Sequence, residues 1–264
     1  MDWRTRDAPQ PDDSLSGYDL APGARAIDLP GEVVVRPDAP RAMDALAADL
    51  LAQAITCVRA FGDFHLAIGG DQSIEALYLR LMSDTELRAL PWAKTHLWMT
   101  HERRVDERDP RRVATALREY VLHHSDIPAA QAHVIPIDDD EAATLYESTI
   151  RETLGWREPG HDRLDCVVLS LEESGYAGGR PILSMPNGDD ALLCDWMAPS
   201  DDEPPTLALT PAFVRASRMI AVIGQGAASH GALEQVRTNP SELAIAPIAG
   251  ELRWYLDESI VSGD

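Results

Sequence analysis

The side chains best suited to chemistry lie in three short runs of the chain. The run His101-Glu102-Arg103-Arg104-Val105 offers an imidazole, which exchanges protons near neutral pH, and guanidinium groups, which bind phosphate through paired hydrogen bonds. Glu172 to Tyr176 adds carboxylates and a phenol. Gly69 to Ser73 has the small residues that let backbone amides approach an anion where a helix begins. Together the runs indicate proton transfer and the binding of an anionic ligand.

Each run also has a purely structural interpretation. Arginines in so acidic a chain often pair with its own carboxylates. The carboxylate of Asp71 would compete with an anion for the amides of Gly69 and Gly70, and either Asp71 or Ser73 could simply cap the helix that follows. For His101 the structural alternative is a solvent-facing side chain at the end of a strand.

The run from His101 to Val105 resembles the Asp-Glu-Arg-x-Val signature of the 6-phosphogluconolactonase family, with His101 in place of the aspartate. Tyr120 to Leu122 and Asp126 to Pro128 resemble the segments that follow it, although Arg112 and Val113 replace a Ser-Asn pair. The resemblance covers roughly residues 30 to 260. It implies a phosphorylated sugar as ligand and neither cofactor nor metal. The residues that it assigns to phosphate or substrate are Gly69, Gly70, Ser73, Arg103 and Arg104, with Arg112 behind them.

The loop after residue 170 departs from the family. A strand ending in Gly-x-Asp-Gly-His is expected there, and the histidine is thought to be the general base for the water that attacks the lactone. In this chain Gly175 matches, but Ser174 replaces the aspartate and Tyr176 replaces the histidine. A phenol, with an ordinary pKa near 10, is a poor base at pH 7. Losing a positioned base typically costs about 10²- to 10⁴-fold in rate.

The loop after residue 223 departs as well. The run from Gly224 to His230 lacks the lysine that the family places shortly after the glycine to hold phosphate. The Gly224-Gln225-Gly226 spacing lacks the third glycine of a dinucleotide-binding loop. Adjacent histidines at 123 and 124 point in different directions on a helix, so they do not favour a metal site.

Two functions from different classes follow. The first is a protein of carbohydrate (pentose phosphate) metabolism that binds a phosphorylated sugar, with lactone hydrolysis weak or lost. The second is a pseudoenzyme with a regulatory or scaffolding role and no sugar-phosphate ligand. A rebuilt hydrolase using His101 with Glu172, and doubtfully Tyr176, is a further hypothesis within the first class. A sugar-phosphate isomerase or deaminase is another, although it too needs acid and base groups.

Alternating strand and helix patterns must position these loops. They predict an α/β fold with a mainly parallel sheet covered by helices on both faces, and the loops beginning at Gly69, His101, Leu171 and Gly224 lie at the carboxyl ends of strands, where such sheets bind ligands. The predicted strands are 32–35, 64–68, 95–100, 133–137, 164–171, 182–184, 206–209 and 219–223. The predicted helices are 43–61, 74–81, 110–123, 140–154 and 227–236, with a closing helix over 252–258.

Composition sets the remaining limits. Residues 1–25 are rich in Asp, Pro, Gly and Ser and predict a flexible arm before a single domain over 26–264. The formal net charge of −21 disfavours nucleic acid and anionic membranes as partners. Cys57, Cys166 and Cys194 are widely spaced, and the first two lie in apolar segments, which predicts buried thiols in a reducing compartment. With no leader or long apolar run, a cytoplasmic location is expected.

Overall fold

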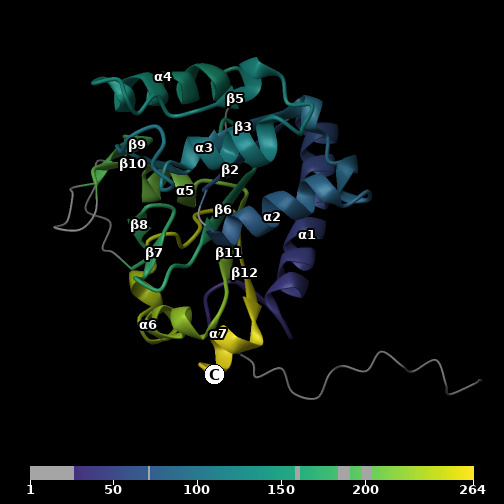
Figure 1. Ribbon diagram of the computed structural model, residues 1–264, viewed down its shortest axis with the longest axis vertical. Helices are drawn as coiled ribbons and strands as arrows, with labels where there is room; N and C mark the ends of the chain where they lie inside the picture. The colour runs from purple at the N-terminus through teal and green to yellow at the C-terminus, as the bar shows by residue number, and fades with distance from the viewer. Residues whose placement is uncertain (1–26, 71, 158–160, 184–190, 198–203) are drawn as a thin grey trace, which may run out of the picture.

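The chain folds around a seven-stranded parallel sheet (Figure 1). The computed structural model describes residues 27–70, 72–157, 161–183, 191–197 and 204–264, so the predicted arm over 1–25 lies outside the described residues. In spatial order the strands are β1 (Glu32–Arg36), β12 (Glu251–Asp257), β11 (Met219–Gly224), β6 (Cys166–Ser170), β2 (Phe64–Ile68), β3 (Thr95–Met99) and β5 (Ala132–His133).

Two small antiparallel sheets extend from the carboxyl end of the main one. The first joins β4 (His101–Arg103), β10 (Thr206–Leu209) and β9 (Cys194–Met197). The second is a hairpin of β7 (Tyr176–Ala177) and β8 (Arg180–Pro181). β4 follows β3 after one residue, so the chain leaves the parallel sheet at the position where the sequence predicts a site loop.

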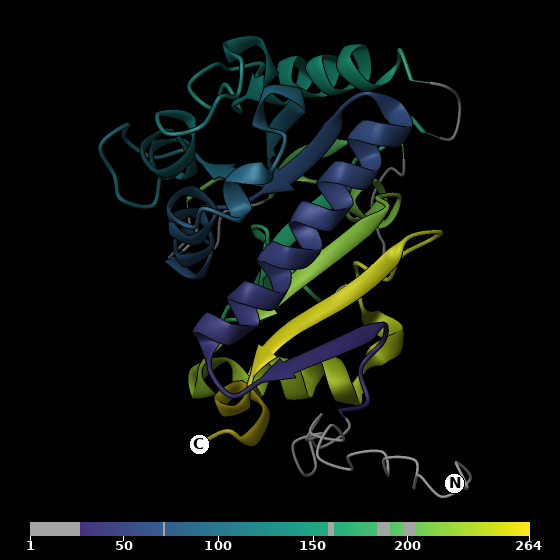
Figure 2. The ribbon, with the colours of Figure 1, turned by 90° about the vertical axis from the view of Figure 1, so that its right-hand side faces the viewer.

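Seven α-helices lie in the described residues, and they cover both faces of the sheet. They are α1 (Ala39–Phe61), α2 (Gln72–Ser83), α3 (Val113–Leu117), α4 (Ala142–Leu154), α5 (Pro211–Arg215), α6 (His230–Thr238) and α7 (Glu258–Ser262). A π-helical turn over Arg118–Leu122 extends α3. Figure 2 shows α1 lying diagonally across one face and α6 behind the sheet. No helix among the described residues is long and apolar enough to cross a membrane.

Local sequence explains the bounds of α1. The side chain of Asp38 accepts a hydrogen bond from the Arg41 amide, and Pro40 stands in the first turn, where its missing N–H costs nothing. The helix ends at Gly62, whose φ of 94° is the left-handed conformation that glycine adopts without a steric penalty. Seven small or apolar side chains along one face are buried against the sheet: Ala42, Met43, Leu46, Ala47, Leu50, Ala54 and Cys57.

The central strands β2, β6 and β11 are buried along their whole length. Continuous apolar runs of this kind are typical of strands that have both faces of a parallel sheet covered. Cys57, Cys166 and Cys194 are buried free thiols, which confirms the expectation for the first two. The predicted α/β class with a mainly parallel sheet is confirmed.

Three expected elements differ from the structure. The closing helix over 252–258 was wrong: these residues form most of β12, which lies between β1 and β11 and is followed only by the short α7. The apolar residues at 252, 254, 255 and 256 fit the spacing of a short helix as well as that of a strand, so periodicity does not separate the two. The strand over 133–137 is only Ala132–His133, and of the strand over 182–184, Leu183 forms a single bridge to Leu243 while Ser184 lies outside the described residues.

Candidate functional site at the carboxyl ends of the strands

The four predicted loops lie together at the carboxyl ends of the strands, on one side of the sheet. The four strands are consecutive in the parallel sheet, in the order β11-β6-β2-β3, and the loops begin where these strands end. Contacts join two of these loops directly, because a Cβ added to Gly179 in the third would lie 2.8 Å from the Cβ of His101 in the second. The expectation that the loops lie at carboxyl ends is confirmed.

His101 is sealed inside the protein rather than facing solvent. Its exposed fraction is 1%, so the structural alternative of a solvent-facing side chain was wrong. Its Nδ1 lies 3.1 Å from the Thr100 hydroxyl oxygen, while Nε2 is buried without a hydrogen-bond partner among the described residues. Burial, followed by the charge of Arg103, lowers the pKa of His101 to about 3. The imidazole is therefore neutral, and its burial argues against contact with a substrate.

Glu102 anchors a helix rather than a ligand. Its carboxylate accepts hydrogen bonds from the amides of Arg103, Val113 and Ala114 at 2.8 to 2.9 Å, which satisfies the open N–H groups at the start of α3. Burial raises the pKa of Glu102 above its ordinary value, and the three amides act against that rise. Arg112 lies 3.6 Å from the same carboxylate.

The Arg112 side chain is engaged in contacts within the protein, so it is not available as a further ligand-binding group beside Arg103. It is buried, and it pairs with Asp138 at 2.6 Å while donating to the Val105 carbonyl at 2.8 Å. Arg104 is also engaged: it donates to the carbonyls of Ile137 and Asp139 and stacks over Trp196 at 4.8 Å. The structural interpretation therefore holds for these two arginines.

Arg103 differs from both neighbours. It is half-buried on β4, opposite Thr206 of β10. Its guanidinium makes no hydrogen bond or ion pair with any residue that the structure describes. A half-buried arginine whose guanidinium forms no ion pair with the described carboxylates, and whose charge acts only through space on Asp109, is the group in this loop best suited to hold an anion from outside.

The third loop is a tight turn that presents Tyr176. The Gly175 amide donates to the Glu172 carbonyl and the Glu172 amide donates to the Tyr176 carbonyl, both at 2.9 Å. Gly175 has a φ of 80°, which the turn requires. Tyr176 is 36% exposed at the start of β7, and Glu172 is half-buried. Tyr176, which the sequence aligns with the expected family base, is thus partly exposed to solvent.

The first loop is closely packed. A Cβ on Gly70 would lie 2.8 Å from Cγ1 of Val113, so the glycine allows the start of α3 to approach β2. The Tyr78 hydroxyl donates to the Gly69 carbonyl. Ser73 lies in the first turn of α2, and Asp71 is outside the described residues. Gly69 and Gly70 therefore have a packing role whether or not the loop binds phosphate.

The fourth loop has an internal carboxylate where the family would place an anionic ligand. The Gly226 amide donates to both carboxylate oxygens of Asp257, at 3.2 and 3.1 Å. The same carboxylate accepts from Ser259 and from the amide of Ile260, and so caps α7. Asp257 was not among the residues predicted for the site. Its position as an aspartate immediately before a short helix, three residues ahead of the Ile260 amide that it accepts from, is a signal that could have indicated this cap.

A stack of histidines lies elsewhere in the sheet and was also not predicted. The rings of His65 and His96 stack at 4.4 Å, those of His96 and His133 at 5.3 Å, and His133 stacks on Trp98 at 3.7 Å. Trp98 donates to Nδ1 of His65 at 3.1 Å, and Nε2 of His65 lies 3.2 Å from Asp63.

Ligand atoms of Asp63, His65 and His96 lie within 4.8 Å of one another, which is close enough to consider a metal ion. The rings of His65 and His96 are only 15° from parallel, so their lone pairs do not converge on one point. Asp63 is already paired with the buried guanidinium of Arg157, whose charge would repel a cation. The geometry therefore fits a neutral aromatic cluster better than a metal centre.

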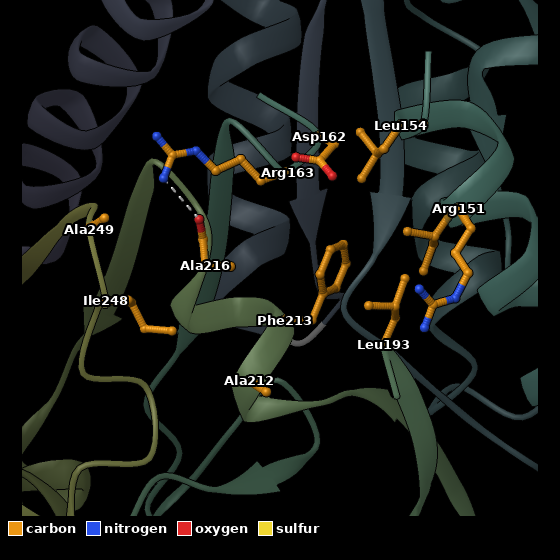
Figure 3. Close-up of a pocket in the computed structure, with 12 residues that line it drawn as sticks. Arg151, Leu154, Asp162, Arg163, Leu193, Ala212, Phe213, Ala216, Ile248 and Ala249 are labelled. Atoms are coloured by element: carbon orange, nitrogen blue, oxygen red, sulfur yellow. Dashed lines mark hydrogen bonds between the residues drawn. The ribbon is translucent and has the colours of Figure 1, made fainter. Parts of the chain in front are cut away.

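A cavity of about 600 Å³ opens at the other end of the molecule (Figure 3). Its lining comes from the end of α4, from α5, and from the segments just before β6 and β12. The side chains around it are mainly apolar, with Phe213 between Leu193 and Ala216, and Arg163 donates to the Ala216 carbonyl at 3.3 Å. None of the residues predicted for the site lines this cavity.

The chain resembles a known protein family and several of its members in sequence. The family model described as glucosamine-6-phosphate isomerases/6-phosphogluconolactonase matches residues 37–254. The human GDH/6PGL endoplasmic bifunctional protein is 28% identical over 227 residues, which is 80% of this chain but only 28% of that protein. The 6-phosphogluconolactonase of a Nostoc species is 25% identical over 218 residues, covering 79% of this chain and 88% of its own.

Solved structures agree at the level of the fold. The devB protein superimposes with a TM-score of 0.74 at 21% identity, covering 88% of this chain and 98% of its own. A monomeric glucosamine-6-phosphate deaminase gives a TM-score of 0.71 at 12% identity, covering 88% and 100%. Because the family model matches most of its length, the chain belongs to the glucosamine-6-phosphate isomerase/6-phosphogluconolactonase family.

Proposed function

We propose that this protein binds a phosphorylated sugar at the carboxyl ends of β2, β3, β6 and β11, and that it hydrolyses 6-phosphogluconolactone weakly or not at all. Family membership supports the ligand class. The single observation that carries the proposal is that Arg103 is half-buried and has no hydrogen bond or ion pair from its guanidinium to the described residues. The predicted alignment of Tyr176 with the family base supports the loss of activity. A site of this kind keeps a phosphate ligand but lacks an effective proton acceptor.

The reaction explains why the base matters. Water adds to the lactone carbonyl carbon, loses a proton, and the ester C–O bond breaks as the ring oxygen takes up a proton. A base near the attacking water must accept the first proton at neutral pH. The Tyr176 phenol is a poor acceptor, and His101 is buried under Gly179. Glu172 is the remaining carboxylate among the proposed groups, so we assign it at most a weak role.

The test is a rate measurement on freshly prepared 6-phosphogluconolactone. We expect the wild-type protein to add little or nothing to the spontaneous hydrolysis. The double variant Ser174→Asp/Tyr176→His restores the two family side chains, and we expect its rate to exceed that of the wild type by about 10²-fold or more. A matched control, Glu173→Asp, changes an exposed neighbour without supplying a base of the family type. Rapid turnover by the wild type would contradict the proposal.

The alternative is a pseudoenzyme with a regulatory or scaffolding role. The capture of the Gly226 amide by Asp257 favours it, because this donor is then not open to a phosphate. Thermal unfolding with millimolar 6-phosphogluconate separates the two functions, since a ligand that binds the folded state raises the unfolding temperature. An unchanged temperature would favour the scaffold. With either function we propose a reducing, cytoplasmic location, because the three thiols are buried and unpaired.

A further inference from the structure

The open edge of the main sheet is formed by β1, a strand with the sequence Glu-Val-Val-Val-Arg. In the described part of the chain β1 pairs only with β12, and Figure 2 shows it at the margin of the sheet. All three valines are partly buried, while Glu32 and Arg36 at the two ends are exposed. Edge strands in stable monomers are usually protected from pairing by charged side chains, a proline or a bulge. In β1 the two charges lie only at the ends, and the three central residues are all valine.

The backbone groups of β1 alternate between the sheet and the outside. The Val35 carbonyl accepts a hydrogen bond from the Arg36 side chain at 2.9 Å, so it faces outward. By the alternation of a strand, the N–H and C=O of Val33 and Val35 both face outward, and those of Val34 face β12. The outer edge therefore offers the donor and acceptor of Val33 and the donor of Val35, and the Val35 carbonyl becomes open once the Arg36 side chain turns away from it.

From this edge we infer that the protein forms a twofold-symmetric dimer through antiparallel pairing of β1 with β1 of a second copy. A register centred on Val34 places Val33 opposite Val35 of the other copy, so that four backbone hydrogen bonds form. The same register places Glu32 opposite Arg36, twice, because the axis relates the two ends of the strand. Opposite charges directly across an antiparallel pair stabilise it.

The charge pattern is what selects a second copy as the occupant of this edge. Glu32 lies 3.3 Å from Arg253 within its own chain, but 61% of its side chain remains exposed and free to meet another arginine. The long-range field opposes association, since each copy has a formal net charge of −21. A five-residue pairing is also small, so we expect a dissociation constant in the micromolar range at about 0.3 M salt, where this repulsion is screened.

Disulfide trapping tests the register in the full-length chain. Val34 sits on the twofold axis as a non-hydrogen-bonded pair, whose Cα atoms lie about 4.5 Å apart, within the range of a disulfide. We expect Val34→Cys to form a covalent dimer on mild oxidation. Val33→Cys is the matched control, because its own counterpart is offset by two residues, about 8 Å away, and cannot bridge. The three native cysteines are buried and do not compete.

Charge exchange tests the ion pairs independently. By sedimentation, Arg36→Glu and Glu32→Arg should each weaken the dimer about tenfold or more, and the double variant Glu32→Arg/Arg36→Glu should recover it. The unfolding temperature of each variant is measured alongside to show that the fold is retained. A wild-type monomer at 100 μM or above, equal trapping of Val33→Cys and Val34→Cys, or a double variant as weak as the singles would overturn the inference.

Discussion

Arg103 and Arg104 are adjacent in the chain yet have different surroundings. Arg104 is held by the Ile137 and Asp139 carbonyls, whereas Arg103 has no internal partner among the described residues. We predict that Arg103→Gln lowers the affinity for 6-phosphogluconate about 10- to 100-fold, because a bidentate phosphate contact is lost. Calorimetric titration measures it, with Arg104→Gln as control. Equal losses in both variants would remove Arg103 from the proposed site.

Glu102 belongs to the family signature, and the structure gives it a stabilising role. It is fully buried and accepts from three backbone amides. We predict that Glu102→Gln lowers the free energy of unfolding by about 2–4 kcal/mol, because an amide replaces one acceptor oxygen beside a buried donor. Denaturant unfolding measures the change. The exposed substitution Glu119→Gln should stay within about 0.5 kcal/mol, and an equally small effect of Glu102→Gln would contradict the anchoring role.

At the scale of elements, the site depends on how closely α3 approaches the loop after β2. Gly70 makes that approach feasible, with Cα of Val113 3.2 Å from the position of an added Cβ. We predict that Gly70→Ala lowers the free energy of unfolding by about 1–3 kcal/mol through overpacking. Gly231→Ala in α6 is the control: nothing lies within 4 Å of its Cβ position, so a gain of up to about 1 kcal/mol is expected. If Gly70→Ala leaves the free energy of unfolding unchanged, the loop can shift to accommodate the added methyl group.

The strands β4 and β7 bring the second and third loops together through His101 and Gly179. A side chain at position 179 would collide with the imidazole, so the histidine in the family's aspartate position depends on a glycine far along the chain. The physical consequence is a neutral, enclosed ring below the loops instead of a carboxylate at the surface.

At the scale of the whole molecule, buried histidines link stability to pH. Burial lowers the pKa of His96 to about 4 and of His133 to about 3, and it also lowers the pKa of His65. The rings of His96 and His133 are therefore neutral between pH 5 and 7 in the folded protein, whereas histidine in the unfolded chain binds a proton below about pH 6.5. The free energy of unfolding should fall as the pH decreases from 7 to 5, by about 1–2 kcal/mol for each of these two histidines.

Replacing one ring tests this linkage. We predict that His133→Phe keeps the stacking on Trp98 and reduces the loss of stability between pH 7 and pH 5, since one titrating group is removed. Urea unfolding at several pH values measures the slope. The exposed His124→Phe should leave the slope unchanged, and identical slopes in all three proteins would mean that other groups dominate.

The sequence by itself determined the fold class and the family. The strand–helix alternation, the helix that ends at Gly62 and the signature at Glu102 and Arg103 are local patterns, and local patterns are visible in a single sequence. The predicted replacement of the family base by Tyr176 is equally a matter of residue type. The strand β12 escaped prediction because its apolar residues, at 252, 254, 255 and 256, fit the spacing of a short helix as well as that of a strand.

Only the tertiary structure decided which charged side chains remain for a ligand. Arg112 pairs with Asp138, 26 residues away, and the Gly226 amide is capped by Asp257, 31 residues away. His101 is sealed by Gly179. Such contacts depend on how distant elements meet in space, and a residue's type and spacing do not reveal them. Arg103, whose guanidinium has no hydrogen-bonding or ion-pair partner in the part of the chain that the structure describes, stands out only after the partners of its neighbours are known.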